Sequence, residues 1–177
     1  MTDDHLVEGC IRKNISAQRE LYERYAPKML SVCLRYMAND DDARDAMHDG
    51  FIKLFDKINK FEQRGSLEGW IRRLFVNTCL EKLRTAKKFS FQRIDEDDTQ
   101  ILHDLTGDAD MQFEVNELLN LVKNLPANLR SVFNLYAIEG YSHDEIAKLL
   151  GIANSTVRAN YFRARTILQK RIKLIYN

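Results

Sequence analysis

Hydrophobic residues recur every three or four positions along most of this chain, which is the spacing of amphipathic helices. Two such stretches stand close together in residues 141–165, YSHDEIAKLLGIANSTVRANYFRAR. Ser142 followed three residues later by Glu145 is a capping-box pattern that begins a helix. Gly151 stands where a helix end favours a left-handed backbone, and a second helix is predicted from Asn154. The stretch therefore predicts two helices joined by a tight turn.

The second helix of this pair has an apolar face for packing and an opposite face that is mainly polar and basic. On the opposite face, small and polar residues come first and arginines follow. That order suits a helix whose N-terminal end enters the major groove of DNA while guanidinium groups hold phosphates. The alternative is an ordinary helical hairpin with a solvated basic face, because the same spacing occurs in proteins that do not bind DNA. The residues of the opposite face are Ser155, Thr156, Arg158, Ala159, Phe162, Arg163 and Arg165.

Three longer amphipathic stretches predict a helical bundle in the N-terminal half. The first begins near Ser16, and Pro27 should kink or divide it because proline lacks the amide donor. The second follows a turn at 39–42 that supplies an N-cap. The third follows the polar loop 61–65, with Ser66 as its cap. Three helices of this length can close a core.

The periodicity breaks in residues 91–111, which are acidic, rich in turn formers and predicted to be a linker. Residues 1–15 show no clear pattern. The chain is therefore predicted to be all-α, with two small helical domains joined by an acidic linker. The first domain, residues 1–90, is the N-terminal helical bundle. The second, residues 112–177, is a four-helix domain that contains the helix-turn-helix.

The composition of the 177 residues, 45% hydrophobic and 30% charged, is typical of a globular protein. No apolar run approaches the roughly 20 residues needed to span a bilayer, and the acidic start of the chain is unlike a signal peptide. Cys10, Cys33 and Cys79 are an odd number without paired spacing. Cys33 and Cys79 fall on apolar helix faces and are predicted to be core residues in a reducing compartment. We expect a cytoplasmic protein.

The net charge of +1 conceals a strong segregation of charge along the chain. Residues 60–88 hold eight Lys/Arg against three Asp/Glu, and residues 141–177 hold seven against two, so each block carries +5. Residues 89–117 hold one against nine, giving −8, and residues 39–50 hold one against five, giving −4. Two separate basic blocks favour contact with a polyanion such as DNA.

Three segments are specific enough to compare with a known family. LPANLRSVFNLYAIEGYSHDEIAKLLGIANSTVRANYFRAR resembles the region with which bacterial RNA polymerase sigma factors of the extracytoplasmic-function (ECF) class bind the minus-35 promoter element. DARDAMHDGFIKLF is similar to the helix with which these factors dock on the polymerase clamp. SLEGWIRRLFVNTCLEKLR resembles the segment that melts and reads the minus-10 element. The resemblance covers essentially the whole chain. It implies a sigma factor of the sigma-70 family that directs promoter-specific transcription initiation.

The resemblance also implies contact residues and partners. It assigns minus-35 contacts to the polar face of the C-terminal helix given above. The partners it implies are core RNA polymerase, promoter DNA and an anti-sigma factor that can be membrane-anchored. At the clamp, His48 stands where the family usually has glutamine. The implied polymerase contacts are Asp45, His48, Asp49 and Phe51, and the implied minus-10 contacts are Arg64, Ser66, Trp70, Arg73, Asn77 and Arg84.

A polar loop beside an aromatic side chain and arginines can hold an unstacked base, which is what reading a melted strand requires. Trp70 fits a core position as well as it fits base stacking. Asp45 and Asp49 are one turn apart, but no second acidic pair or histidine set accompanies them, which argues against a metal site. We expect no cofactor, no metal, no small-molecule substrate and no enzymatic activity. The remaining alternatives are a stand-alone helix-turn-helix regulator and a small helical enzyme, for which no converging catalytic residues are found.

Overall fold

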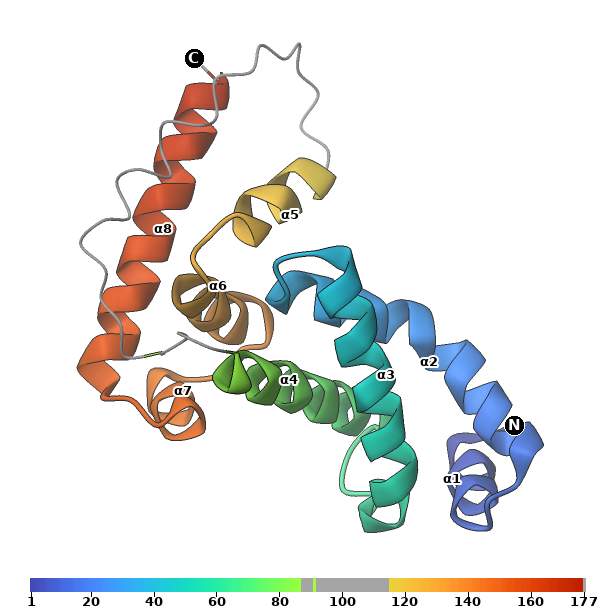
Figure 1. Ribbon diagram of the computed structural model, residues 1–177. Helices are drawn as coiled ribbons and strands as arrows, with labels where there is room; N and C mark the ends of the chain where they lie inside the picture. Colours follow the sequence, from blue (N-terminus) through green and yellow to red (C-terminus); the bar gives the residue numbers. More distant parts are fainter. Residues whose placement is uncertain (87–90, 92–114, 177) are drawn as a thin grey trace. The chain divides into compact units, whose positions relative to one another are not determined.

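The computed structural model describes residues 1–86, 91 and 115–176 of the chain. The chain divides into two compact units, residues 1–85 and residues 86–177. Every regular element of the described residues is a helix, which confirms the predicted all-α class with two helical domains (Figure 1). Apart from residue 91, the predicted acidic linker lies outside the described residues. No helix in the described ranges is both long enough and apolar enough to cross a membrane.

The first unit is a bundle in which α2, α3 and α4 pack against one another and α1 packs against α2 and η1. Its interior is formed by large side chains that are fully buried, among them Tyr36, Leu54 and Phe75. The elements are α1 (Asp3–Ile11), α2 (Ile15–Tyr36), α3 (Asp40–Lys57), the 3-10 turn η1 (Ile58–Lys60) and α4 (Leu67–Thr85).

Helix α1 is an element that the sequence pattern did not predict. Thr2 caps it, because its side-chain oxygen accepts a hydrogen bond from the backbone N–H of His5. Leu6, Val7 and Cys10 lie on one face and are buried. A cap followed by apolar residues at this spacing is a helix signal, but nine residues give too few turns for periodicity to stand out.

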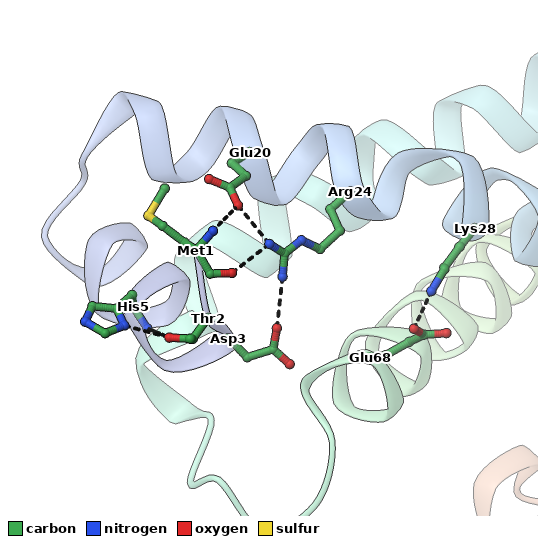
Figure 2. A network of polar contacts seen from close by, with 8 residues as sticks. All are labelled: Met1, Thr2, Asp3, His5, Glu20, Arg24, Lys28 and Glu68. Atoms are coloured by element: carbon green, nitrogen blue, oxygen red, sulfur yellow. Dashed lines mark hydrogen bonds and ion pairs between the residues drawn. The ribbon is translucent and has the colours of Figure 1, made fainter.

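Polar contacts tie α1 to the N-terminal half of α2 (Figure 2). The Arg24 guanidinium donates to Asp3 at 3.1 Å, to Glu20 at 2.8 Å and to the carbonyl oxygen of Met1 at 2.8 Å. The amino group of Met1 also pairs with Glu20, at 2.8 Å. These contacts, chiefly the one with the terminal amino group, hold the pKa of Glu20 below its usual value. The α1–α2 junction is therefore both packed and charge-paired.

Pro27 does not divide α2, which is a single helix from Ile15 to Tyr36. A proline inside a helix removes one backbone hydrogen bond and costs about 3 kcal/mol. Tyr25 and Met29, on either side of it in the sequence, are both buried in the core. Burial of one such side chain contributes about 1.5–3 kcal/mol, so packing holds the helix together across the proline.

The cap of α3 and the burial of two cysteines, one on α2 and one on α4, agree with the predictions from the sequence. The turn at 39–42 supplies the N-cap as predicted: it is Asn39, whose side-chain oxygen accepts a hydrogen bond from the N–H of Asp42 at 2.8 Å. Cys33 and Cys79 are both 0% exposed, which confirms that they are core residues. The hydrogen bond with Cys33, together with burial, raises the pKa of the Cys79 thiol, so Cys79 stays protonated and unreactive at neutral pH.

The described part of the second unit, residues 115–176, contains the predicted four α-helices and one short π-helical turn. Its core joins Leu121, Val122, Leu125 and Leu129 to the inner face of the last helix. The elements are α5 (Val115–Lys123), α6 (Ala127–Phe133), the π-helical turn η3 (Asn134–Ile138), α7 (His143–Leu150) and α8 (Asn154–Tyr176).

Two buried arginines complete the end of α5. Arg130 donates to the carbonyl oxygens of Lys123 at 2.7 Å and Leu125 at 3.3 Å. Arg171 of α8 donates to the carbonyl oxygen of Leu121 at 3.3 Å. The last carbonyls of a helix lack partners within it, and cations suit that end of the helix dipole. Burial lowers the pKa of Arg130 to about 10, which leaves it protonated at neutral pH.

Candidate nucleic-acid and polymerase interfaces

The predicted helix-turn-helix is formed by α7 and α8. The hydroxyl of Ser142 accepts from the N–H of Glu145 at 3.2 Å, and the Glu145 carboxylate accepts from the N–H of Ser142 at 2.7 Å. Gly151 ends α7 with φ 68° and ψ 35°, the left-handed conformation that glycine adopts at no steric cost. Ile152 is buried in the corner. The capping box, the glycine turn and the start of α8 at Asn154 are all confirmed.

The two helices are also joined at their N-terminal ends. The side-chain amide of Asn154 donates a short hydrogen bond to the carboxylate of Asp144. Asp144 lies in the first turn of α7, where a carboxylate complements the helix dipole. This contact fixes the first residue of α8 relative to α7. The first turn of α8, where DNA-contacting residues are expected, is therefore held firmly.

Helix α8 has one buried face and one accessible face. The buried face carries Val157, Asn160, Ala164 and Leu168, which pack into the unit. Phe162 stands on the accessible face and is 70% exposed. All seven predicted minus-35 residues are accessible in the structure: Ser155, Arg158, Phe162 and Arg165 are exposed, and Thr156, Ala159 and Arg163 are half-exposed.

The arginines of this face are available to an external anion. Among the described residues, no carboxylate forms an ion pair with Arg158, Arg163 or Arg165. Guanidinium groups without an internal partner lose little when they bind phosphate, because no existing ion pair has to be broken. The accessible face of α8 is thus a basic surface beside small and polar side chains.

Aromatic side chains support α8 from the other helices of the unit. The ring of Tyr161 lies 4.5 Å from the ring of Tyr136 and is stacked with Phe133 at 6.1 Å. The imidazole of His143 stacks on Tyr136 at 4.5 Å. Tyr161 is half-buried in this cluster. The cluster braces the middle of α8 against η3 and α7.

In the first unit, the loop between η1 and α4 has an unusual backbone. Gln63 has φ 56°, in the left-handed region that residues other than glycine seldom adopt, and Gly65 has φ 114°. The loop is closed at its base, where the rings of Phe61 and Trp70 lie 5.6 Å apart. Ser66 caps α4 as predicted, because its hydroxyl accepts from the N–H of Gly69 at 3.1 Å. The loop tip is exposed.

The predicted minus-10 residues follow the loop along one side of α4. Trp70, Arg73, Asn77 and Arg84 are separated by three, four and seven residues, a spacing that places them on one helix face. Trp70 is half-buried, so its ring contacts Phe61 and still has an accessible edge or face. Arg64, Ser66, Arg73 and Arg84 are exposed and Asn77 is half-exposed.

The predicted polymerase contacts on α3 divide between its surface and the core. Asp45 and His48 are exposed and Asp49 is half-exposed. Phe51, in contrast, is 4% exposed, and its ring packs 4.6 Å from Tyr22 and 5.1 Å from Phe75. Phe51 therefore lies on the inner side of α3 and supports the surface from below, and its contact with the polymerase stays a prediction.

The acidic side of α3 is coupled to the basic helix α4. Lys82 donates to the Asp49 carboxylate at 2.9 Å, and Lys53 pairs with Glu81. The hydrogen bond with Asp49 raises the pKa of Lys82, and the negative charges of Asp49, Asp45 and Asp42 add to the shift. One carboxylate of the predicted docking set is thus already engaged. Asp45 is the most accessible acid of that set.

The described residues contain no group of three or more His, Cys, Asp or Glu side chains arranged to hold a metal ion. What they do contain is two separate basic surfaces, one on α8 and one on α4 with its loop, and an acidic surface on α3. Each consists of side chains suited to binding a charged macromolecule.

Comparison with known proteins identifies both units. Residues 21–89 match the model of the family described as Sigma-70 region 2, and residues 116–168 match that of Sigma-70, region 4. The ECF RNA polymerase sigma-E factor of Haemophilus influenzae is 27% identical over 183 residues, covering 98% of this chain and 96% of that protein. The ECF RNA polymerase sigma factor SigE of Mycolicibacterium smegmatis is 29% identical over 160 residues, covering 85% of this chain and 59% of that protein.

A solved structure has a similar fold. It is the sigma factor RpoE of Bartonella quintana, crystallised in complex with the anti-sigma factor NepR. The two chains superpose with a TM-score of 0.54 at 18% identity, over 88% of this chain and 96% of the other. The order of the two matched regions along the chain is the order that the sequence motifs predicted.

Proposed function

This chain belongs to the extracytoplasmic-function class of the sigma-70 family, and we propose that it performs promoter recognition with the three surfaces of its two units. A member of this class binds core RNA polymerase and directs promoter-specific transcription initiation. The observation that carries the proposal is the pair of basic surfaces on separate units of one chain. A protein that contacts a promoter at two elements needs two such surfaces.

The accessible face of α8 reads the upstream, minus-35 element. Ser155, Thr156 and Ala159 lie at the N-terminal end of the helix, where small and polar side chains can approach base edges in the major groove. Arg158 and Arg163 hold phosphates and fix the register of the helix on the duplex. Phe162 and Arg165 extend this contact further along α8. The short α7–α8 turn keeps the helix rigid, which base reading requires.

The loop at 61–66 and the outer face of α4 read the downstream, minus-10 element as a single strand. A base inside a duplex hides its Watson–Crick edge, so it must leave the stack to be read. The exposed loop tip offers polar groups for that edge, and Trp70 offers an aromatic surface beside it. Stacking of a base on an aromatic ring contributes about 1–3 kcal/mol, comparable to the cost of unpairing. Arg64, Arg73 and Arg84 follow the backbone of the strand.

The acidic surface of α3 docks on the polymerase. Asp45 and His48 are exposed and make the direct contacts, while Asp49 contributes charge from its pair with Lys82. A carboxylate cluster at the beginning of a helix is steered towards a basic surface by its charge. Phe51 has an indirect part, because it packs under the surface and sets the position of α3 on the core.

The partners that follow are core RNA polymerase and promoter DNA, and the place of action is the cytoplasm, where both are found. An anti-sigma factor is a further partner that we propose from the Bartonella quintana complex. That regulator can be soluble or membrane-anchored. The role of this chain is recognition, and the catalytic step of transcription belongs to the polymerase.

Binding measurements with and without core polymerase test the proposal. A labelled promoter duplex should bind weakly to the chain alone and tightly to the chain with core enzyme. Asp45→Lys should abolish the gain from core enzyme and leave the helical circular dichroism spectrum unchanged. Glu8→Lys is the matched control, because Glu8 is an exposed acid on α1, outside the docking surface. Asp49→Lys is less informative, since it would place two ammonium groups together at Lys82.

Two results would count against the proposal. If the Asp45→Lys variant still co-purifies with core polymerase, the docking surface is elsewhere. If the chain alone binds the duplex tightly as a dimer and core enzyme adds nothing, the protein is a stand-alone helix-turn-helix regulator.

A further inference from the structure

A contact between α1 and the loop at 61–66 joins two parts of the chain that are far apart in sequence. The Asp4 carboxylate accepts a hydrogen bond from the side-chain amide of Gln63 at 3.0 Å, across 59 residues. We infer that Asp4 is a positioning residue, and that α1 braces this loop in the conformation that receives the melted DNA strand. That the loop receives a melted DNA strand rests on the proposed function.

Helix α1 is rigid enough to act as a brace. Leu6, Val7 and Cys10 are buried on its inner face, at 0%, 5% and 2% exposure. At the start of the helix, the Arg24 guanidinium of α2 holds Asp3 at 3.1 Å (Figure 2). Asp4 follows Asp3 directly in the same helix turn, so its backbone is fixed by both kinds of contact. The Asp4 side chain therefore projects from a backbone that is held in place, and it can hold the loop.

The ends of the loop are fixed by other contacts, and these leave its tip unsupported. Phe61 packs on Trp70 at one end, and Ser66 caps α4 at the other. Beyond the loop, Lys28 of α2 pairs with Glu68 in the first turn of α4 at 2.5 Å (Figure 2). Between these ends lies Gln63, whose φ of 56° is one that its side chain disfavours. The hydrogen bond to Asp4 holds this residue.

Bracing the tip in the free protein has a consequence for binding. A loop that is ordered only when DNA arrives loses conformational freedom at that moment, which reduces affinity. A loop held by Asp4 has lost that freedom already, on folding. The gain applies to the strand that the loop receives, and it does not apply to duplex DNA bound by α8 in the other unit. A positioning role of Asp4 therefore predicts weaker binding of the single strand alone, whereas a general loss of stability would weaken binding of both DNAs.

Three variants separate the hydrogen bond from the charge. Asp4→Ala removes the acceptor. Asp4→Asn removes the charge but keeps a side-chain oxygen that can accept from Gln63. Glu8→Ala removes an exposed carboxylate from the same helix without touching the loop. The expected order is that Asp4→Ala is defective and that Asp4→Asn and Glu8→Ala resemble the parent chain.

The first measurement is made on the full chain without DNA. Backbone ¹⁵N relaxation gives order parameters for the amides of residues 62–65, which should be about 0.8 in the parent and fall below about 0.6 in Asp4→Ala. Unchanged order parameters in Asp4→Ala would overturn the inference, whatever the loop binds.

The second measurement uses the holoenzyme with two probes from one promoter that it transcribes. One is a labelled single strand with the non-template sequence of the minus-10 element, and the other is a duplex with the minus-35 element. Asp4→Ala should weaken binding of the single strand about threefold to tenfold, the range expected for one ordinary intramolecular hydrogen bond, and leave the duplex affinity unchanged. Equal losses for both probes, or a loss with Asp4→Asn as large as with Asp4→Ala, would overturn the inference.

The two measurements also distinguish this inference from the proposed function. If Asp4→Ala loosens the loop and the parent holoenzyme does not bind the single strand at all, the brace is supported and the assignment of the loop to the minus-10 element fails. If the loop loosens and single-strand binding is normal in every variant, the positioning role fails while the proposed function stands.

Discussion

Replacing two arginines on the accessible face of α8 should change both the affinity for DNA and its dependence on salt. Arg158 is exposed and Arg163 half-exposed, and no carboxylate of the described residues pairs with either. Each guanidinium is therefore free to neutralise one phosphate and release the counterions condensed there. In the account above these are backbone contacts, so the loss should be nearly the same for every upstream sequence.

The magnitude follows from the number of phosphates. The slope of log K against log salt is about −0.9 for each phosphate neutralised on duplex DNA. The double variant Arg158→Ala/Arg163→Ala should therefore have a slope less steep by about 1.8. Between 50 mM and 200 mM salt, a fourfold change, the affinity deficit of the variant should shrink by a factor of about 12, that is, four raised to the power 1.8. Either single variant should show a factor of about 3.5.

The assay is fluorescence anisotropy of a labelled upstream duplex, titrated with holoenzyme at four or more salt concentrations. Lys173→Ala is the matched control, because Lys173 is an exposed cation of the same helix, 15 residues or about 22 Å beyond Arg158. Its slope should equal that of the parent. A deficit of constant size at all salt concentrations would refute the reasoning, since it would mean that the arginines act without neutralising phosphate.

The remaining predictions concern the first unit. Gly50→Ala should lower the free energy of unfolding of this unit by about 1–3 kcal/mol, measured by denaturant unfolding, because the new Cβ would lie 2.5 Å from the buried ring of Phe75. A stability equal to that of the parent would mean that the α3–α4 contact is looser than the structure shows. Glu20→Gln should be less stable than the parent at pH 7. Since folding lowers the pKa of this carboxyl from 4.5, the difference should be present above about pH 4.5 and vanish as the pH falls through the lower, folded pKa. A difference that persists at pH 2 would show that the charge of Glu20 is not its cause. Asp45→Lys should prevent co-purification with core polymerase, measured by affinity pull-down with Glu8→Lys as the control.

Features specified by short stretches of sequence could be predicted well. The capping box at Ser142, the left-handed Gly151 and the Asn39 cap each depend on a few adjacent residues, and the structure contains all three. The accessible face of α8 was predictable for the same reason. On a regular helix, sequence spacing alone decides which residues share a face.

Features that depend on tertiary packing were harder to predict. Pro27 is an expected break, but the burial of Tyr25 and Met29 keeps α2 in one piece. The resemblance implies that Phe51 contacts the polymerase, whereas its ring packs on Phe75 on the inner side of α3. For Pro27, a local preference was outweighed by contacts with residues distant in sequence.

The loop at 61–66 shows the same limit at the candidate site. Its composition indicated a polar loop, and the resemblance indicated its role. Nothing in the sequence pattern relates Gln63 to Asp4. Helical periodicity relates residues within one helix, whereas these two residues are 59 positions apart, and the sequence signal for α1 itself was weak. The strained backbone of Gln63 and the contact that holds it could be seen only in the structure.

The most direct test of the account is transcription with purified components. Core RNA polymerase from the same bacterium is incubated with fragments of its own genome, with and without this chain, and the 5′ ends of the transcripts are mapped. The account predicts discrete start sites that appear only with the chain and that are lost with Asp45→Lys. Absence of chain-dependent start sites at every promoter in the genome would contradict it.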